Sequence, residues 1–322
     1  MSVSAPSSVW SGLVGQGQAI ETLQRAVDGQ GMTHAWLFTG PPGSGRSNAA
    51  IAFAAALQCE RGGCGQCHAC RTVLAGSHSD VSVTRTETAV IKVDGIRELV
   101  VRSALAPAQH RWQIMIVEDA DRLNESSGNA LLKAIEEPAR RTLWLLCAPT
   151  VEDVLPTIRS RCRNVVLTTP SAAEVADFLV TRHGVDAGVA AYAARASQGH
   201  IGRARALATD EGTRNRRREV VSIPTGLTSL GACMNAAQNL VDIAKAETEA
   251  VGEEINARER LELDAVFGDD RKARTSRSYK AALSQLTESQ KQRGKRRTLD
   301  VVDRCLMAVS YTHLTLPTNR EV

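Results

Sequence analysis

Aromatic residues are scarce in this chain of 322 residues, in which phenylalanine, tryptophan and tyrosine together make up only 3%. Alanine, valine and leucine must do most of the packing, which favours layers rich in helix. Long apolar runs are missing too, since none reaches the roughly 18 residues of a membrane span. Neither sign of charge dominates, because the formal net charge is only +4, so composition offers no strong reason to expect nucleic-acid binding. The length suggests two or three domains.

A secretion signal is not predicted either. The chain opens with MSVSAPSS, which has neither a basic start nor an apolar core. We therefore expect a cytoplasmic location and no association with a membrane. In a reducing compartment, clustered cysteines indicate a metal site rather than disulfides.

Four of the eight cysteines form such a cluster, with the spacing C-x4-C-x2-C-x2-C at Cys59, Cys64, Cys67 and Cys70. Four thiolates on one short loop can supply the tetrahedral shell that zinc prefers. His68 lies inside the cluster, but the four cysteines already complete that shell. A closed four-thiolate site has no open position for catalysis, so we predict structural zinc, with an iron–sulfur cluster as the alternative.

Residues 40–47 read GPPGSGRS, a phosphate-binding loop with one departure from the pattern G-x-x-x-x-G-K-[ST]. Arg46 stands where lysine is expected. Lysine reaches the β- and γ-phosphates as a compact point charge, whereas arginine is a bulkier planar fork. The loop therefore predicts a site built like that of an ATPase that does not run the reaction itself.

A second departure follows the apolar stretch 113–117, where Glu118 and Asp119 stand in inverted order compared with the usual Asp-Glu. The longer Glu118 would crowd a metal ion, and the shorter Asp119 would fall back from the attacking water. Together with Arg46, this order predicts reduced or absent hydrolysis, and an inefficient ATPase is the alternative. The residues of this degenerate nucleotide site are Gly40, Gly43, Gly45, Arg46, Ser47, Glu118 and Asp119.

Strand and helix patterns alternate up to Thr169, which predicts an α/β fold with a mostly parallel sheet covered on both faces. The expected strands are 36–39, 80–85, 113–118, 142–147 and 165–167, and the expected helices include 48–58, 93–104 and 124–137. Three short helices are expected in 170–208, with breaks at Gly184 and Gly199.

The remainder is predicted to be helical as well. Residues 209–229 mix charge, glycine and proline like a boundary, and 230–268 have a long helical pattern. Residues 271–297 carry ten Lys/Arg and one acid, which we interpret as a solvated helix face and loop, with a nucleic-acid contact as the alternative. Residues 309–322 do not resemble what precedes them, and we interpret them as a non-native tail.

One arginine is a candidate for chemistry in trans. Arg161 lies in the triplet Ser160-Arg161-Cys162 that closes a predicted helix. It is compatible with an ordinary ion pair, or with a finger that reaches the γ-phosphate of a neighbouring subunit.

Taken together, these motifs resemble the clamp-loader subunits of bacterial DNA polymerase III, which are AAA+ proteins. They occur in family order within residues 10–205. The matching stretches are VGQ (14–16), HAWLFTGPPGSGRS (34–47), the four cysteines, GSHSD (76–80), VDGIREL (93–99), NALLKAIEEP (129–138) and LPTIRSRC (155–162).

The resemblance implies an AAA+ domain with a zinc module in residues 1–168, a helical lid in 169–210 and an all-α collar in 211–308. We expect the collar to be truncated, because the tail 309–322 takes the place of its last helices.

Four departures resemble the delta-prime type of the family more than its hydrolysing gamma/tau type. They are Arg46, the Glu118-Asp119 order, Ala148-Pro149 in the place of a polar sensor with Thr150 one step along, and Gly202 in the place of a sensor arginine, for which Arg203 or Arg205 could partly substitute.

The resemblance thus implies a component of the polymerase holoenzyme without ATPase activity of its own, which holds any nucleotide without hydrolysing it. Arg161 would act on ATP in an adjacent gamma/tau subunit. The implied partners are gamma/tau and delta subunits in a heteropentamer and, through that complex, the sliding clamp and primed DNA. A gamma/tau-like ATPase and a zinc-dependent nucleic-acid binding module are the alternatives.

Overall fold

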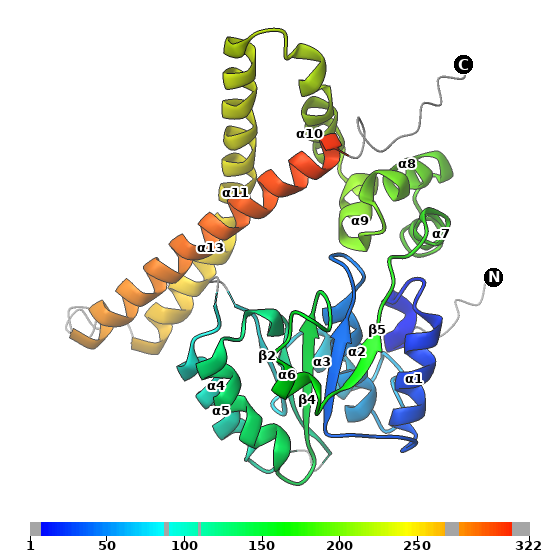
Figure 1. Ribbon diagram of the computed structural model, residues 1–322, viewed down its shortest axis with the longest axis vertical. Coiled ribbons are helices and arrows are strands. Elements are labelled where there is room, and N and C mark those ends of the chain that lie inside the picture. Colours follow the sequence, from blue (N-terminus) through cyan, green and yellow to red (C-terminus); the bar gives the residue numbers. More distant parts are fainter. Residues whose placement is uncertain (1–7, 87–89, 109–110, 268–276, 311–322) are drawn as a thin grey trace. The chain divides into compact units, whose positions relative to one another are not determined.

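The computed structural model describes residues 8–86, 90–108, 111–267 and 277–310 (Figure 1). The chain divides between Thr209 and Asp210 into two compact units. Within the described ranges, no helix is both long enough and apolar enough to cross a membrane.

A five-stranded sheet with the order β2-β3-β4-β1-β5 forms the centre of the first unit, and all of its strand pairs are parallel. Strands β1, β3 and β4 are buried along their whole length, which explains their nearly continuous apolar sequences. The strands are β1 (Ala35–Thr39), β2 (Val81–Thr84), β3 (Gln113–Val117), β4 (Thr142–Ala148) and β5 (Arg163–Val166).

Helices cover both faces of the sheet, and alternate residues of each strand pack against opposite layers. On β1, Trp36 and Phe38 join the cluster under α1, α2 and α3, whereas Leu37 joins the cluster under α4, α5 and α6. These two layers around a parallel sheet confirm the predicted α/β fold class. The covering helices are α1 (Gly17–Val27), α2 (Arg46–Gln58), α3 (His68–Leu74), α4 (Val93–Ser103), α5 (Glu125–Glu136) and α6 (Pro156–Arg159), with short 3₁₀ turns η1 (Val9–Gly12) and η2 (Ala120–Arg122).

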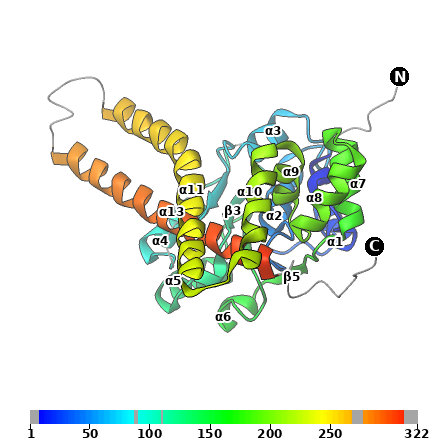
Figure 2. The ribbon, with the colours of Figure 1, turned by 90° about the horizontal axis from the view of Figure 1, so that it is seen from above.

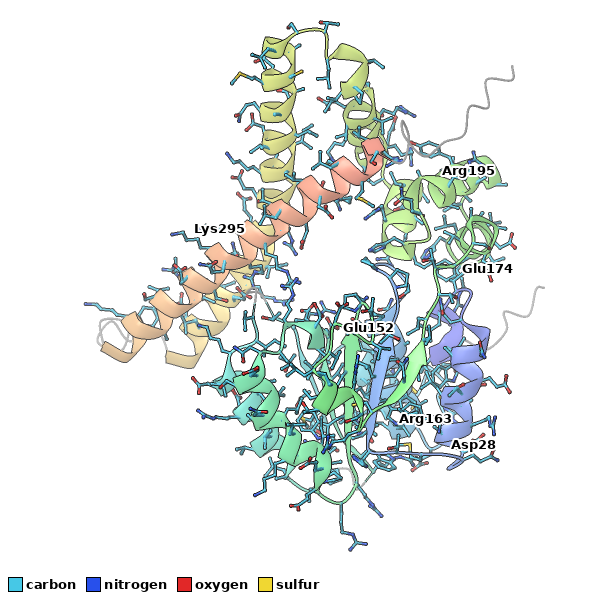
Figure 3. All side chains as sticks on the ribbon, in the orientation of Figure 1. Asp28, Glu152, Arg163, Glu174, Arg195 and Lys295 are labelled. Carbon is cyan, nitrogen blue, oxygen red and sulfur yellow. The ribbon has the colours of Figure 1, made fainter. Side chains whose placement is uncertain are left out.

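Three short helices follow, as the sequence predicts: α7 (Ala172–His183), α8 (Ala187–Ser197) and α9 (Ile201–Thr209). They share a separate, alanine-rich core. A capping box of Ser171 and Glu174 (Glu174 is labelled in Figure 3) starts α7. Gly184 ends the helix in the left-handed conformation.

The stretch 209–229, which was expected to be a boundary, contains the division between the two units, after Thr209. Most of it is nevertheless regular structure, helix α10 (Glu211–Ser222) and the 3₁₀ turn η3 (Ile223–Gly226). Asp210 caps α10 by accepting hydrogen bonds from the backbone of Gly212 and Thr213. The helix is rich in arginine and buries only Val220, so it lacks the apolar period that would have predicted it.

Helices α11 (Leu230–Phe267) and α13 (Arg277–Ser310) lie side by side and run antiparallel (Figures 1 and 2). Polar pairs connect them along their length: Glu247 with Arg304, Thr248 with Thr298 at 3.2 Å, and Arg293 Nη2 with Glu259 at 2.6 Å. A small apolar cluster of Val220, Leu240, Ile243, Ala244, Val301, Val302, Cys305 and Val309 adds to the packing.

The basic segment 271–297 lies partly in this hairpin. Its residues 277–297 belong to α13, where Lys295 is exposed (Figure 3), and 271–276 lie outside the described residues. The stretch interpreted as a non-native tail begins inside α13, which includes Val309 and Ser310, and its residues 311–322 lie outside the described residues. The division at residue 168 and the collar assignment stay predictions.

The ion pair between Glu259 and Arg293 makes the stability of this hairpin depend on pH. Hydrogen bonds from Arg293 hold the pKa of Glu259 below its ordinary value. Because the folded state lowers this pKa, the pair stabilises the fold fully above the unfolded pKa of about 4.3, and the contribution is lost as the pH falls below it. Thermal unfolding between pH 7 and pH 3 should therefore depend less on pH in Glu259→Gln than in the wild type. Glu249→Gln, an exposed glutamate of the same helix, should behave like the wild type.

Candidate functional site

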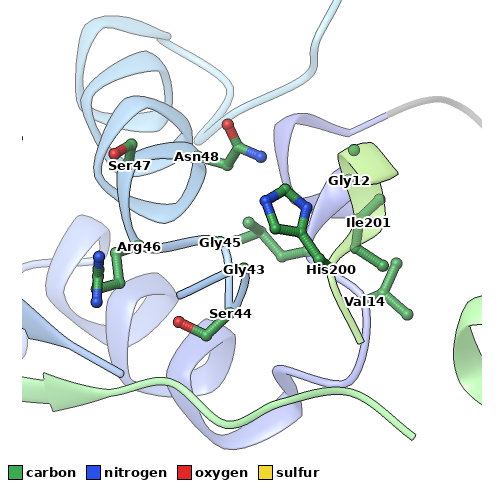
Figure 4. Close-up of a pocket in the computed structure, with 12 residues that line it drawn as sticks. Gly12, Val14, Gly43, Ser44, Gly45, Arg46, Ser47, Asn48, His200 and Ile201 are labelled. Carbon is green, nitrogen blue, oxygen red and sulfur yellow. The ribbon is translucent and has the colours of Figure 1, made fainter. Parts of the chain in front are cut away.

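The glycine loop lies where a phosphate-binding loop belongs, between the buried strand β1 and the first turn of α2. Gly43 and Gly45 have φ of 90° and 89°, a region that side chains rarely adopt, so the loop depends on glycine at both positions. A cavity of about 170 Å³ opens beside the loop (Figure 4). It is lined by Gly12, Leu13, Val14, Gly43, Ser44, Gly45, Arg46, Ser47, Asn48, His200, Ile201 and Gly202.

Arg46 does not extend across this cavity. Its guanidinium donates to the carbonyl of Gly40 in the same loop and lies on the side of the loop away from His200 (Figure 4). A lysine here would carry its charge toward the β- and γ-phosphates. In this chain the positive charge of Arg46 instead lies against the backbone of its own loop, at the carbonyl of Gly40.

Both acids that follow β3 are held by the chain segment after β2. Because Thr84 pairs with Val117 in the sheet, Arg85 comes to lie beside Glu118. The two side chains form an ion pair in which Glu118 is 9% exposed and Arg85 is 69% exposed, and the pairing raises the pKa of Arg85. Asp119 Oδ2 accepts a hydrogen bond from the backbone N–H of Thr86 at 3.2 Å. A magnesium ion would have to compete with Arg85 for Glu118.

Beside the first sensor position, Thr150 is engaged within its own turn. The hydroxyl and the amide of Thr150 both donate to Asp153 Oδ2, at 2.9 and 3.0 Å. Among the described residues that line the cavity, Gly202 is present, but Arg203 and Arg205 are not.

The four clustered cysteines converge at the end of α2 and the start of α3. Their sulfur atoms all lie within 4.8 Å of one another, and Cys59 Sγ is 3.7 Å from the sulfurs of Cys64 and Cys67. Zn–S bonds of 2.3 Å in a tetrahedron place the sulfurs about 3.8 Å apart. The arrangement therefore fits a zinc ion, and exposed His68 is not part of the set.

Backbone amides favour the thiolate form at two of the four cysteines, Cys59 and Cys64. Burial raises the pKa of Cys59, but amides of Cys64, Gly63 and Arg61 outweigh that effect and lower it. Amides of Gln66 and Cys67 lower the pKa of Cys64 to about 6. Zinc binds the thiolate form, so the lowered pKa values of Cys59 and Cys64 favour metal binding, whereas burial raises the pKa of Cys70, which must lose its proton when the metal binds.

Arg161 lies beyond the end of α6, apart from the glycine loop in the sequence. Its Nη2 is 2.6 Å from Glu136 Oε1 at the end of α5, and its Nη1 donates to the carbonyl of Thr157 at 2.7 Å and to Ser160 Oγ at 3.2 Å. The Arg161 side chain is 39% exposed. In the single chain Arg161 thus forms an ordinary surface ion pair with Glu136, which is one of the two roles that the sequence allowed.

Three residues near these sites were missed in the sequence. Arg85 contacts Glu118 and His200 lies against Gly43, and both partners are distant in the sequence. Glu136, the partner of Arg161, lies in the stretch NALLKAIEEP, for which the sequence predicted no contact. Only Arg85 had a usable signal, because the ends of adjacent parallel strands meet at one edge of a sheet.

Comparison with known proteins places this geometry in context. Residues 15–171 match the family model described as DNA polymerase III, delta subunit. A 152-residue stretch is 38% identical to DNA polymerase III subunit delta' of Pseudomonas aeruginosa and covers 45% of this chain and 46% of that protein. A 157-residue stretch is 36% identical to DNA polymerase III subunit gamma/tau of Mycobacterium bovis and covers 47% of this chain and 27% of that protein. The chain therefore spans less than half the length of either relative.

Among solved structures, a gamma subunit-related protein of DNA polymerase III from Thermotoga maritima aligns with 91% of this chain and 99% of its own. The sequence identity is 16% and the TM-score is 0.43, so no conclusion rests on this likeness.

Proposed function

Over residues 15–171 the chain belongs to the clamp-loader subunit family of DNA polymerase III, and from that premise we propose that it is a delta-prime-type subunit that hydrolyses no ATP itself. It acts in the cytoplasm with gamma/tau and delta subunits in a heteropentamer. Through that complex it contributes to ATP-driven loading of the sliding clamp onto primed DNA.

One observation carries this proposal: Glu118, the first acid after β3, is held in an ion pair by Arg85, and the chain's own cation thus takes the place that magnesium would need. Hydrolysis requires an acid that holds magnesium and a group that orients water. The contact of Arg46 with Gly40 also supports the absence of hydrolysis, because the guanidinium donates to the loop backbone and does not extend toward a bound phosphate.

The chain would contribute Arg161 to a neighbour's reaction. In an assembled ring this guanidinium would stabilise the charge that develops on the transferred phosphoryl group of ATP bound by the adjacent gamma/tau subunit. Cys59, Cys64, Cys67 and Cys70 would hold a structural zinc, which organises the loop between α2 and α3.

The isolated chain should accordingly show no ATP hydrolysis above background in a phosphate-release assay with magnesium. Ser47→Ala should leave that result unchanged, because a silent site has no activity to lose.

A gamma/tau-like ATPase is the second candidate, since the chain is nearly as similar to a gamma/tau subunit as to a delta' subunit. Brisk hydrolysis by the isolated chain that disappears in Ser47→Ala or Glu118→Gln would favour this candidate and contradict our proposal.

A further inference from the structure

Three lysines lie along one side of helix α13. Lys280, Lys291 and Lys295 are all exposed, and Lys295 is labelled in Figure 3. Eleven and four positions separate them, which are three turns and one turn of an α-helix, so the three side chains leave the helix on the same side. Ser284, also exposed, lies on that side one turn after Lys280. We call these four residues the lysine face.

The lysine face is not used to hold the hairpin together. Among the described residues, no carboxylate lies within ion-pair distance of any of its lysines, whereas arginines of the same helix pair with acids of α11. Arg293 lies 2.6 Å from Glu259, and Arg304 pairs with Glu247. The arginines thus connect α13 to α11, and the ammonium groups of the lysine face are left for a partner outside the hairpin.

Only one acid accompanies the lysine face. Residues 277–297 contain seven Lys or Arg and a single acid, Glu288, whose Oε1 accepts a hydrogen bond from Gln292 Nε2 at 2.7 Å. A shallow depression of about 500 Å³ lies here, lined by Lys280, Leu283, Ser284, Thr287 and Glu288. An ammonium group and a hydroxyl group therefore face a space that an anionic group could enter.

The chemistry of the lysine face favours a phosphate backbone over a protein partner. Protein interfaces are depleted in lysine and rich in apolar and aromatic side chains at their centre. Between Lys280 and Lys295 the described residues expose no large apolar side chain, and the exposed ones of α13 begin at Leu299. Ammonium and serine hydroxyl groups are, in contrast, ordinary contacts of the phosphates of nucleic acids.

The same comparison favours a duplex over a single strand. Proteins that bind single strands stack the bases on aromatic side chains. The one aromatic residue in the sequence of α13, Tyr279, is buried and donates to Asp264 Oδ1 at 2.7 Å, so it offers no stacking surface. A duplex keeps its bases inside and presents only phosphates to a straight helix.

The length of the lysine face also agrees with a duplex. From Lys280 to Lys295 the helix rises by about 22 Å, at 1.5 Å per residue. Duplex DNA advances by about 3.4 Å per base pair, so this length corresponds to about six base pairs.

We propose that the lysine face of α13 binds the phosphate backbone of duplex DNA without preference for sequence. In the proposed function the chain reaches DNA only through the complex, whereas this contact is made by α13 itself. The inference therefore goes beyond the proposed function and depends neither on Arg161 nor on hydrolysis.

The test is binding of a fluorescein-labelled duplex of about 20 base pairs to the full chain, measured by fluorescence anisotropy at several KCl concentrations. Lys280→Gln, Lys291→Gln and Lys295→Gln are combined in one variant, the lysine-face variant. We expect it to bind about tenfold or more weakly at low salt. The slope of log K against log[KCl] should become shallower by about one for each lost phosphate contact.

Arg25→Gln, Arg195→Gln and Lys245→Gln, combined, form the matched control, because these residues are exposed on α1, α8 and α11. Both triple variants lower the formal net charge from +4 by three, to +1, but only the lysine-face variant should change the slope. Arginine at all three positions of the lysine face should keep the binding, since guanidinium groups also contact phosphates. If the lysine-face variant unfolds, its single substitutions replace it.

Four results would overturn the inference. They are an unchanged slope in the lysine-face variant, an equal loss of binding in the control variant, equal affinity for a single strand of the same sequence, and tighter binding of poly-L-glutamate than of the duplex, which would indicate an acidic protein as the partner. Hydrolysis is measured separately, and ATPase activity of the isolated chain would contradict only the proposed function.

Discussion

Arg161→Ala is expected to reduce ATP hydrolysis at the site it faces in the assembled complex by about 10³-fold or more. Arginine fingers in phosphoryl transfer contribute about 10³–10⁵ in rate, or roughly 4–7 kcal/mol of transition-state stabilisation. The competing contact in the single chain is weak by comparison. Both members of the pair with Glu136 are more than a third exposed, and such pairs are worth about 0–1 kcal/mol. Exchanging Glu136 for a neighbour's phosphate is therefore favourable.

The measurement is single-turnover hydrolysis by the complex reconstituted with gamma/tau and delta subunits, because total turnover also includes sites that Arg161 does not face. Arg161→Lys should be nearly as inactive as alanine, since an ammonium cannot form the same two-pronged contact. Arg159→Ala is the control, because it removes a guanidinium from the same short helix. The variants should unfold at the same temperature as the wild type.

Arg46→Ala completes this series. It should change turnover of the complex little, because Arg46 contacts the loop of a silent site. If Arg46→Ala abolished hydrolysis while Arg161→Ala did not, the delta-prime assignment would be wrong.

Removal of zinc is expected to have the largest effect on stability. The purified chain should contain one zinc ion, and a chelator should lower the melting temperature of the first unit. Cys70→Ser should destabilise it by on the order of 4 kcal/mol, the range in which loss of a metal falls. For a unit of this size, that corresponds to a melting temperature lower by on the order of 10 °C. The cause is that Cys70 is fully buried in the same core as α2, so losing the metal also disturbs the packing around it.

Cys233→Ser is the matched control, because Cys233 is exposed in α11 and lies outside the cluster. It should shift the unfolding free energy by less than about 0.5 kcal/mol. Metal content is measured by atomic emission and stability by calorimetry. A chain that contains no zinc, or that melts identically with and without chelator, would refute the metal assignment. Iron with visible absorption would instead indicate the iron–sulfur alternative.

Local chemistry made much of the first unit predictable. The strand 35–39, the glycine loop and helix α2 follow directly from a buried apolar run, residues that tolerate positive φ and an alanine-rich segment. The cysteine cluster was equally readable, since a spacing of two to four residues brings thiolates together without help from distant parts of the chain. Helix α10 was missed because its surface is charged almost throughout, so no apolar period marks it.

The contacts that control the candidate sites were not readable in this way. Arg85 meets Glu118 because β2 pairs with β3, His200 covers Gly43 because α9 starts beside the loop, and Arg161 meets Glu136 because α6 ends near α5. Each of these contacts joins residues separated by 25 or more positions, and no periodicity or spacing rule spans such distances. The sequence could therefore identify a departure from an ATPase pattern. The tertiary structure alone decided which residues contact Glu118, Gly43 and Arg161. These contacts depend on strand order and helix packing, because burial of the shared cores determines which surfaces meet.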